Sequence, residues 1–253
     1  MNYFSYPTAA ERYARGRPYF HPLVIERLIA FLGPKKPFSR ALDVGCGVGH
    51  STVPLETVAR FIVGADLSAE MLGHAPREGN LQFVNALAEE LPFAPSSFEL
   101  ITAGLAFHWF ERDRFLREAS RLLVAGGRLV IYTNWFTGRM LENPRFESWF
   151  RDEYQRRYPH PTGDRRPLED AAAAAYGFTF ERRENYENEV SFTSSSLLGY
   201  LLTRSDVIAA VEEGHESLAG VEAWITAALA PLFASENATF EFGGWIWYLR
   251  KTG

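Results

Sequence analysis

One stretch constrains the fold of this chain more than any other. Residues 40–50 read Arg-Ala-Leu-Asp-Val-Gly-Cys-Gly-Val-Gly-His, a short apolar run followed by Gly45, Gly47 and Gly49 at alternate positions. The run predicts a buried strand, and residues 51–60 predict a helix after the glycines. Glycine lets the backbone approach a ligand closely, and a helix start offers free N–H groups and a positive dipole end. The stretch therefore predicts a binding site for a nucleotide-like ligand.

Strands and helices alternate along the chain after this stretch. The first five predicted strands are apolar runs rather than alternating patterns, which is typical of parallel strands buried on both faces and joined by right-handed crossovers, and the last two are expected to form a hairpin-like pair. They are expected at 41–44, 61–66, 81–85, 98–103, 128–133, 178–190 and 238–249. The fold class we predict is α/β: a Rossmann-like, doubly wound, mostly parallel seven-stranded sheet. One of its strands is antiparallel, and a helical cap covers the ligand edge.

Four segments follow from this pattern. We expect an N-terminal lid segment and first helix (1–36), a cofactor-binding core (37–134), a helical cap insertion (135–175) and a C-terminal part of the core (176–253) with a strand pair and substrate-side helices. The cap is predicted from the end of the alternation and from its many aromatic and arginine residues.

Composition excludes several classes of protein. No run of about 18 apolar residues indicates a membrane span, and the N-terminus lacks the pattern of a secretory signal. The formal charge of −5 argues against a broad nucleic-acid surface. The single cysteine, Cys46, excludes an intrachain disulfide, and the histidines show no metal-ligand spacing, so we predict no metal site. We expect a cytoplasmic protein with a small-molecule substrate and leave its oligomeric state open.

The glycine loop is compatible with two types of cofactor site, one for a dinucleotide and one for another nucleotide-like cofactor. A dinucleotide site wants Gly-x-Gly-x-x-Gly, but the position of the third glycine, counted from Gly45, holds His50. Both site types place an acid at the end of the second strand, where it accepts hydrogen bonds from ribose hydroxyls, and Asp66 occupies that position. The loop and the acid alone leave both types open.

Five motifs in order carry a resemblance. The chain resembles the class I S-adenosylmethionine-dependent methyltransferases, in particular the type 11 group that includes trans-aconitate methyltransferase-like enzymes. The matching segments are Leu-Asp-Val-Gly-Cys-Gly-Val-Gly at 42–49, Gly-Ala-Asp-Leu-Ser-Ala-Glu-Met at 64–71, Ala-Glu-Glu-Leu-Pro-Phe at 88–93 with Ser-Phe-Glu-Leu-Ile at 97–101, Ala-Phe-His-Trp at 106–109, and Arg-Leu-Leu-Val-Ala-Gly-Gly-Arg-Leu at 121–129. A phosphate-free, cationic cofactor also suits a site that has two carboxylates and no nearby lysine.

The resemblance implies a set of residues that bind S-adenosylmethionine and its product S-adenosylhomocysteine. Asp66 would bind both ribose hydroxyls, Asp43 would neutralise the cationic end directly or through water, and Ala103 and Gly104 would offer backbone groups to the methionine ammonium. The remaining residues line the rest of the cofactor: Gly45, Gly47 and Gly49 its methionine part; Leu67, Met71, Leu87, Ala88 and Glu89 its adenine; Tyr13 and Arg17 its outer side.

Methyl transfer requires alignment and desolvation rather than a nucleophilic triad. His108 is the candidate general base, and the alternative is a histidine bonded to its loop that holds Trp109. Trp109 and Trp135 follow strand ends, where they would line the acceptor pocket or pack in the core. We predict methyl transfer by direct displacement to oxygen, nitrogen or carbon of a small acceptor, with a carboxylate as one option. The alternatives are an NAD(P)-dependent oxidoreductase and a methyltransferase-like binding module without turnover.

Overall fold

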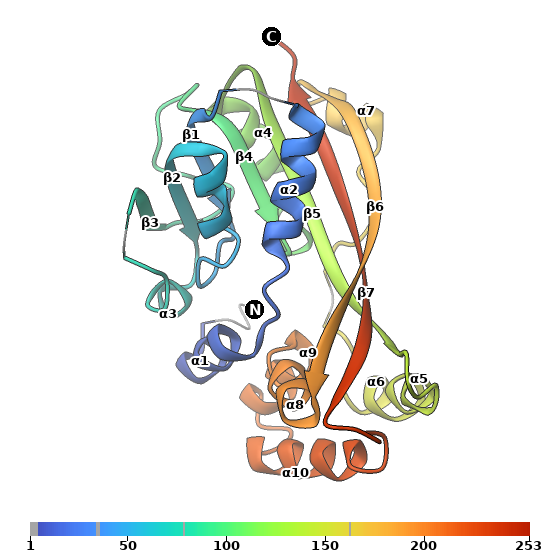
Figure 1. Ribbon diagram of the computed structural model, residues 1–253. Coiled ribbons are helices and arrows are strands. Elements are labelled where there is room, and N and C mark those ends of the chain that lie inside the picture. The colour runs from blue at the N-terminus through green and yellow to red at the C-terminus, as the bar shows by residue number, and fades with distance from the viewer. Residues whose placement is uncertain (1–4, 34–35, 78, 162) are drawn as a thin grey trace. The chain divides into compact units, whose positions relative to one another are not determined.

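The computed structural model describes residues 5–33, 36–77, 79–161 and 163–253, and its strands form one sheet (Figure 1). The seven strands lie in the order β3-β2-β1-β4-β5-β7-β6. Neighbours among β1 to β5 pair in parallel, and β7 runs opposite to β5 and β6 (Figure 1). This confirms the predicted fold class. The strands are β1 (Phe38–Val44), β2 (Ala59–Asp66), β3 (Leu81–Asn85), β4 (Phe98–Gly104), β5 (Leu123–Met140), β6 (Phe178–Thr193) and β7 (Asn237–Lys251).

Helices connect the strands. The α-helices are α1 (Pro7–Gly16), α2 (His21–Leu32), α3 (Ala69–Leu72), α4 (Arg112–Leu122), α5 (Arg145–Trp149), α6 (Gln155–Arg157), α7 (Asp170–Ala174), α8 (Ser194–Leu201), α9 (Ser205–Glu212) and α10 (Leu218–Leu229). Two short 3₁₀ helices, η1 (Val53–Thr57) and η2 (Phe107–Trp109), follow β1 and β4, and a π-helical turn, η3 (Phe150–Tyr154), links α5 to α6.

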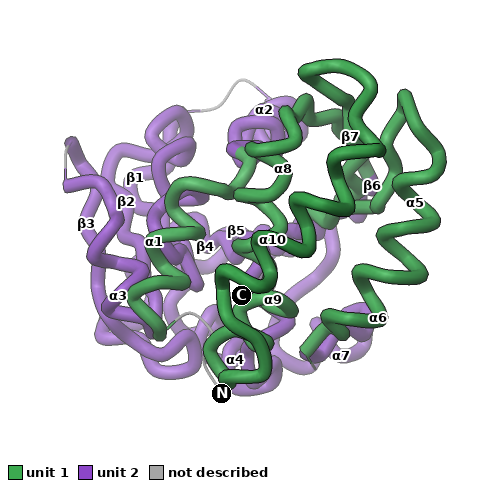
Figure 2. The backbone as a smooth tube through the Cα atoms, turned by 90° about the horizontal axis from the view of Figure 1, so that it is seen from below, with its two compact units in different colours: residues 1–18, 134–162, 186–244 green, residues 19–133, 163–185, 245–253 purple. Residues whose placement is uncertain are grey.

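The chain packs into two compact units, coloured in Figure 2. Unit 1 comprises residues 1–18, 134–162 and 186–244, and unit 2 comprises residues 19–133, 163–185 and 245–253. Strands β5, β6 and β7 each contribute residues to both units. The units group the chain by packing, whereas the four predicted segments divide it along the sequence and stay a prediction.

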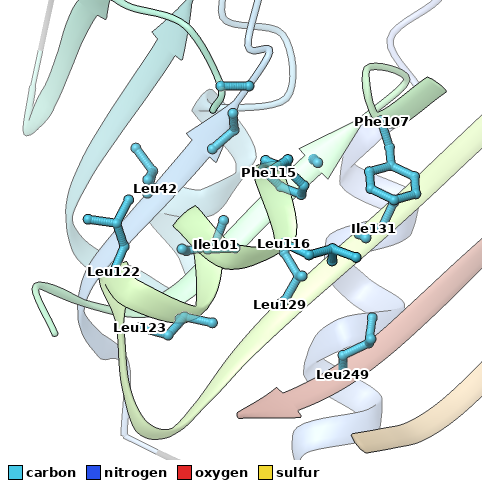
Figure 3. Close-up of a cluster of buried hydrophobic side chains, with 14 of the residues drawn as sticks. Leu42, Ile101, Phe107, Phe115, Leu116, Leu122, Leu123, Leu129, Ile131 and Leu249 are labelled. Carbon is cyan, nitrogen blue, oxygen red and sulfur yellow. The ribbon is translucent and has the colours of Figure 1, made fainter. Parts of the chain in front are cut away.

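Unit 2 is built around an aliphatic core between the sheet and α4. Apolar residues of α4 recur at helical spacing, and this face packs on strand residues such as Leu42, Ile101 and Leu129 (Figure 3). All three of these leucine and isoleucine side chains are fully buried. This layer holds the carboxyl ends of β1, β2 and β4 in register, and ligands of such sheets bind at those ends.

Unit 1 has a core of its own, and that core is rich in aromatic rings. Phe136 of β5 contacts the rings of Phe150, Tyr200 and Phe242 at centroid distances of 5.0, 5.6 and 5.2 Å. Many of the chain's aromatic side chains therefore pack in the core of this unit.

The helix predicted over residues 51–60 is wrong. After the glycine loop the chain forms only the five-residue η1, and β2 already begins at Ala59, which pairs with Phe38. Strand pairing shortens the connection, and β-branched residues such as Thr52 and Val53 have low helix propensity. The argument from a helix dipole at this loop therefore does not apply.

The predicted cap is helical only in part. Residues 135–140 continue β5, and helices appear at 145–157 and Asp170–Ala174. Beyond Thr133 buried and exposed residues alternate, with Phe136 and Met140 buried and Arg139 exposed. This alternation of burial is typical of a half-buried strand, but the adjacent aromatic residues Trp135 and Phe136 break the matching hydrophobic pattern in the sequence.

Candidate cofactor site

The glycine loop in unit 2 directs its N–H groups inward. The N–H groups of Gly45 and Cys46 donate to the carbonyl oxygen of Ala65 at 2.8 and 3.1 Å, and Gly49 donates to Cys46 at 2.9 Å. Gly47 donates to Oδ2 of Asp66 at 2.8 Å. A pyrophosphate site needs such N–H groups free for phosphate oxygens, so this loop is poorly suited to a dinucleotide.

Gly45 shows why the loop needs glycine. Its φ is +72°, a left-handed conformation that side chains rarely adopt. A Cβ at this position would lie 2.4 Å from Cβ of Ala106 and 3.0 Å from the ring of Phe110. The loop is therefore pressed against the segment that follows β4.

Asp66 stands at the end of β2, beside this loop. Its Oδ1 accepts a hydrogen bond from the N–H of Ser68 at 2.8 Å, and its Oδ2 accepts the bond from Gly47. Burial raises the pKa of Asp66, and these backbone donors partly offset the rise. A carboxylate oxygen can accept more than one hydrogen bond, so each oxygen keeps acceptor capacity. Two fixed oxygens of this kind match the two adjacent hydroxyls of a ribose.

Asp43 is fully buried beneath the loop. Oδ2 accepts hydrogen bonds from the hydroxyls of Ser51 and Thr52 at 2.6 and 2.8 Å, and Oδ1 accepts one from Thr102 at 2.8 Å. Burial raises the pKa of Asp43 to about 6, although the hydroxyl donors oppose the rise. Asp43 has no exposed surface, and the role that the resemblance implies for it, neutralising the cationic end directly or through water, stays a prediction.

The residues predicted for the adenine divide into exposed and buried groups. Leu67 and Leu87 are 50% and 43% exposed, which is unusual for large apolar side chains, whereas Met71 and Ala88 are buried. Oε1 of Glu89 accepts a hydrogen bond from the N–H of Glu111 at 2.7 Å. The two exposed leucines offer apolar surface that a flat heterocycle would cover.

Ala103 and Gly104 are buried at the end of β4. Two residues that the sequence reasoning missed, Tyr132 and His21, lie next to them. Tyr132 of β5 lies across Gly104, and its hydroxyl is 2.9 Å from Nδ1 of His21 at the start of α2. His21 was set aside with the other histidines for lack of metal-ligand spacing. The signal for Tyr132 was a polar hydroxyl directly after the apolar run of residues 129–131.

His108 and Trp109 lie in η2, which follows β4. Their rings are 4.7 Å apart, and the carbonyl oxygen of His108 accepts a hydrogen bond from the N–H of Asp164 at 2.9 Å. A Cβ on Gly163 would lie 3.2 Å from Cδ2 of the His108 ring. A later segment thus fixes the backbone of the loop at His108. Both roles of His108, as a base or as the residue that holds Trp109, stay predictions.

Three predicted site residues belong to unit 1 instead. Trp135 is 47% exposed and its ring lies against Gly243, where a Cβ would be 2.5 Å from Cζ2. The guanidinium of Arg17 lies 4.9 Å from the ring of Tyr13 and 5.5 Å from that of Tyr200. The structure therefore groups these residues with the aromatic unit, and their predicted roles at a cofactor or acceptor stay predictions.

No three histidine, cysteine, aspartate or glutamate side chains within the described ranges are close enough to hold a metal ion. Likewise, none of the helices in those ranges combines the length and apolar character that a membrane crossing requires.

The residues of unit 2 fit S-adenosylmethionine better than a dinucleotide. Four N–H groups of the loop are engaged, Asp66 can receive a ribose, and exposed leucines flank the position expected for adenine. On a sheet of this order, these features define a Rossmann-like α/β domain for a nucleoside cofactor without phosphate.

Comparison with known proteins gives the family. The family described as "Methyltransferase domain" matches residues 42–131. An uncharacterized methyltransferase of Mycobacterium bovis is 30% identical over 205 residues, which cover 79% of this chain and 76% of that protein. The chain belongs to the S-adenosylmethionine-dependent methyltransferases, and S-adenosylmethionine is its cofactor.

One further relative matches a shorter part of the chain, and one solved structure matches most of it at lower identity. The malonyl-[acyl-carrier protein] O-methyltransferase of Methylococcus capsulatus is 40% identical over 114 residues, covering 42% of this chain and 40% of that protein, so the match spans less than half of that relative. A solved structure from Anaeromyxobacter dehalogenans, described as a candidate type II methyltransferase, has a TM-score of 0.66 at 24% identity. It covers 93% of this chain and 95% of that one, and it shows the shared fold.

Proposed function

We propose that this enzyme transfers the methyl group of S-adenosylmethionine to a small-molecule acceptor that carries a carboxylate, as in the trans-aconitate methyltransferase-like group. The observation that carries the cofactor assignment is the hydrogen bonding of Asp66, because its carboxylate is held by Gly47 and Ser68 with acceptor capacity left on both oxygens. The proposed acceptor class rests on arginines of the cap region.

The residues of unit 2 divide the work of binding. Asp66 accepts the ribose hydroxyls, and Leu67 and Met71 pack against the adenine. The backbone at Ala103 and Gly104 binds the methionine ammonium. These roles follow the resemblance position by position, and their burial and hydrogen bonding are compatible with them.

The bound cofactor supplies a methyl group on a sulfonium, already activated for displacement. The acceptor atom forms the new bond to the methyl carbon as the carbon–sulfur bond breaks, and the sulfur keeps that electron pair. His108 takes the proton of an acceptor that must lose one, and Trp109 beside it excludes water from the reacting atoms. A carboxylate oxygen needs no base, so for such an acceptor His108 contributes only by position.

Arginines of the cap region support a carboxylate on the acceptor. Arg139 and Arg157 are paired with Glu241 and Glu216. Arg165, which belongs to unit 2 like the proposed cofactor residues, is exposed and makes no ion pair within the described part of the chain. An arginine without a carboxylate partner can bind a substrate carboxylate with two parallel hydrogen bonds.

Calorimetric titration with S-adenosylhomocysteine tests the cofactor assignment, with NADH as the competing ligand. We expect binding of S-adenosylhomocysteine and none of NADH, and the reverse result would refute the assignment. Transfer of radiolabelled methyl from S-adenosylmethionine, measured with small di- and tricarboxylic acids and their matching amides, tests the acceptor class. Methylation of the amides but not the acids would contradict it.

A further inference from the structure

Two buried polar side chains, His21 and Tyr132, lie beside the end of β4, where we place the methionine ammonium. Gly104 and Tyr132 are directly opposite each other in the pairing of β4 with β5. A Cβ on Gly104 would lie 2.5 Å from both Cζ and the hydroxyl oxygen of Tyr132. The tyrosine ring therefore fills the space that a side chain at position 104 would need.

His21 holds the hydroxyl end of that ring. Nδ1 of His21 and the hydroxyl of Tyr132 are joined by a hydrogen bond of 2.9 Å, and the two residues are 5% and 1% exposed. The ring of Phe20 stacks on His21 at 4.3 Å. A buried polar pair costs free energy unless its hydrogen bond is made, so neither side chain is a neutral filler.

The backbone next to Gly104 is in a strained conformation. Leu105 has a φ of +58°, which is uncommon for a residue with a side chain. Its N–H donates to the carbonyl oxygen of Tyr132 at 3.0 Å. Strain of this kind persists only where the surroundings fix it, and it concentrates at ligand sites. Tyr132 fixes this turn twice, through its carbonyl and through its ring.

We propose that His21 and Tyr132 form a positioning pair for the amino-acid end of the cofactor. The pair holds the turn at Gly104 and Leu105 so that its backbone groups face the methionine part, and it leaves the ribose and adenine contacts unaffected. This proposal rests on the proposed function, since it needs the ammonium to bind at Ala103 and Gly104.

Two ligands separate this role from a general structural one. S-adenosylhomocysteine carries the amino-acid end, and 5′-methylthioadenosine has the same adenosine without it. Loss of a positioning pair weakens binding of the first ligand alone, whereas general loosening of the site weakens both.

The chain offers matched variants. Tyr132→Phe removes one oxygen and keeps the ring, and His21→Phe keeps the stacking on Phe20 and removes the hydrogen bond. His21→Asn places an amide near the position of Nδ1 and should restore binding. Tyr248→Phe is the control, because this buried tyrosine also packs on α2, against Phe31, and loses a hydroxyl that bonds to Glu184.

Calorimetric titration of folded variants should show a clear difference. Tyr132→Phe and His21→Phe raise the Kd for S-adenosylhomocysteine about 5-fold, the ratio for one ordinary hydrogen bond, and leave that for 5′-methylthioadenosine unchanged. Tyr248→Phe changes neither. Unchanged binding of S-adenosylhomocysteine in both variants, or an equal loss for both ligands, overturns the positioning role alone. Wild-type protein that binds neither ligand overturns the proposed function, and this inference with it.

Discussion

Replacement of Asp43 by Asn tests how burial determines the pH dependence of stability. The pKa of Asp43 rises from its ordinary value of 3.8 to about 6, with burial as the largest cause. The folded chain therefore holds this proton more tightly than the unfolded chain does. Its stabilising contribution is complete below pH 3.8 and is lost as the pH rises through about 6. The full effect corresponds to about 3 kcal/mol.

The Asn variant removes the titration and keeps the shape of the side chain. Its carbonyl can still accept from a hydroxyl, and its amide can donate to one, because hydroxyl groups serve in both roles. Urea unfolding, followed by tryptophan fluorescence, gives the free energy of unfolding of both proteins at each pH. The difference between the two curves cancels every titrating group that they share.

Between about pH 5 and about pH 8, the wild type should lose about 1.4 kcal/mol of stability relative to Asp43→Asn. A companion variant, Thr102→Val, removes one of the donors that lower the pKa and should move the loss to higher pH. The assignment of a buried Asp43 with a raised pKa would be refuted by a stability difference between the two proteins that does not vary with pH. It would also be refuted if the wild type gained stability relative to Asp43→Asn as the pH rises.

Other predictions concern binding and packing. Asp66→Ala should weaken the binding of S-adenosylhomocysteine, measured by calorimetry, by about 1–3 kcal/mol, the scale for a lost charged hydrogen-bond partner. Unchanged affinity would exclude the ribose role. Gly45→Ala should lower the free energy of unfolding by about 1–3 kcal/mol, since its Cβ would clash in a left-handed conformation, and a neutral result would count against the loop geometry. Asp206→Ala leaves the buried Arg204 without its carboxylate and should cost about 3–5 kcal/mol, whereas Asp152→Ala, at an exposed ion pair, should leave urea unfolding unchanged.

Local features in the sequence were enough for the sheet and the loop. The apolar runs at 61–66, 81–85 and 98–103 mark strands that the structure confirms within two residues at each end. Strands buried on both faces of a parallel sheet need such runs whatever surrounds them, so the pattern transfers directly from sequence to fold. The acid after the second strand, Asp66, follows from the same local order.

Tertiary structure alone decided what these features contact. Pairing of β1 with β2 replaced the predicted helix after the loop with η1, and hydroxyls from two separate segments, residues 51–52 and β4, bond to Asp43. His21 and Tyr132 are 111 residues apart in the chain, and no local pattern links them. Spacing in a sequence reports periodicity within one element, whereas hydrogen bonds between elements depend on how the elements pack. The sequence by itself determined the fold class and the family of cofactor, and packing decided which side chains are buried, bonded and held around it.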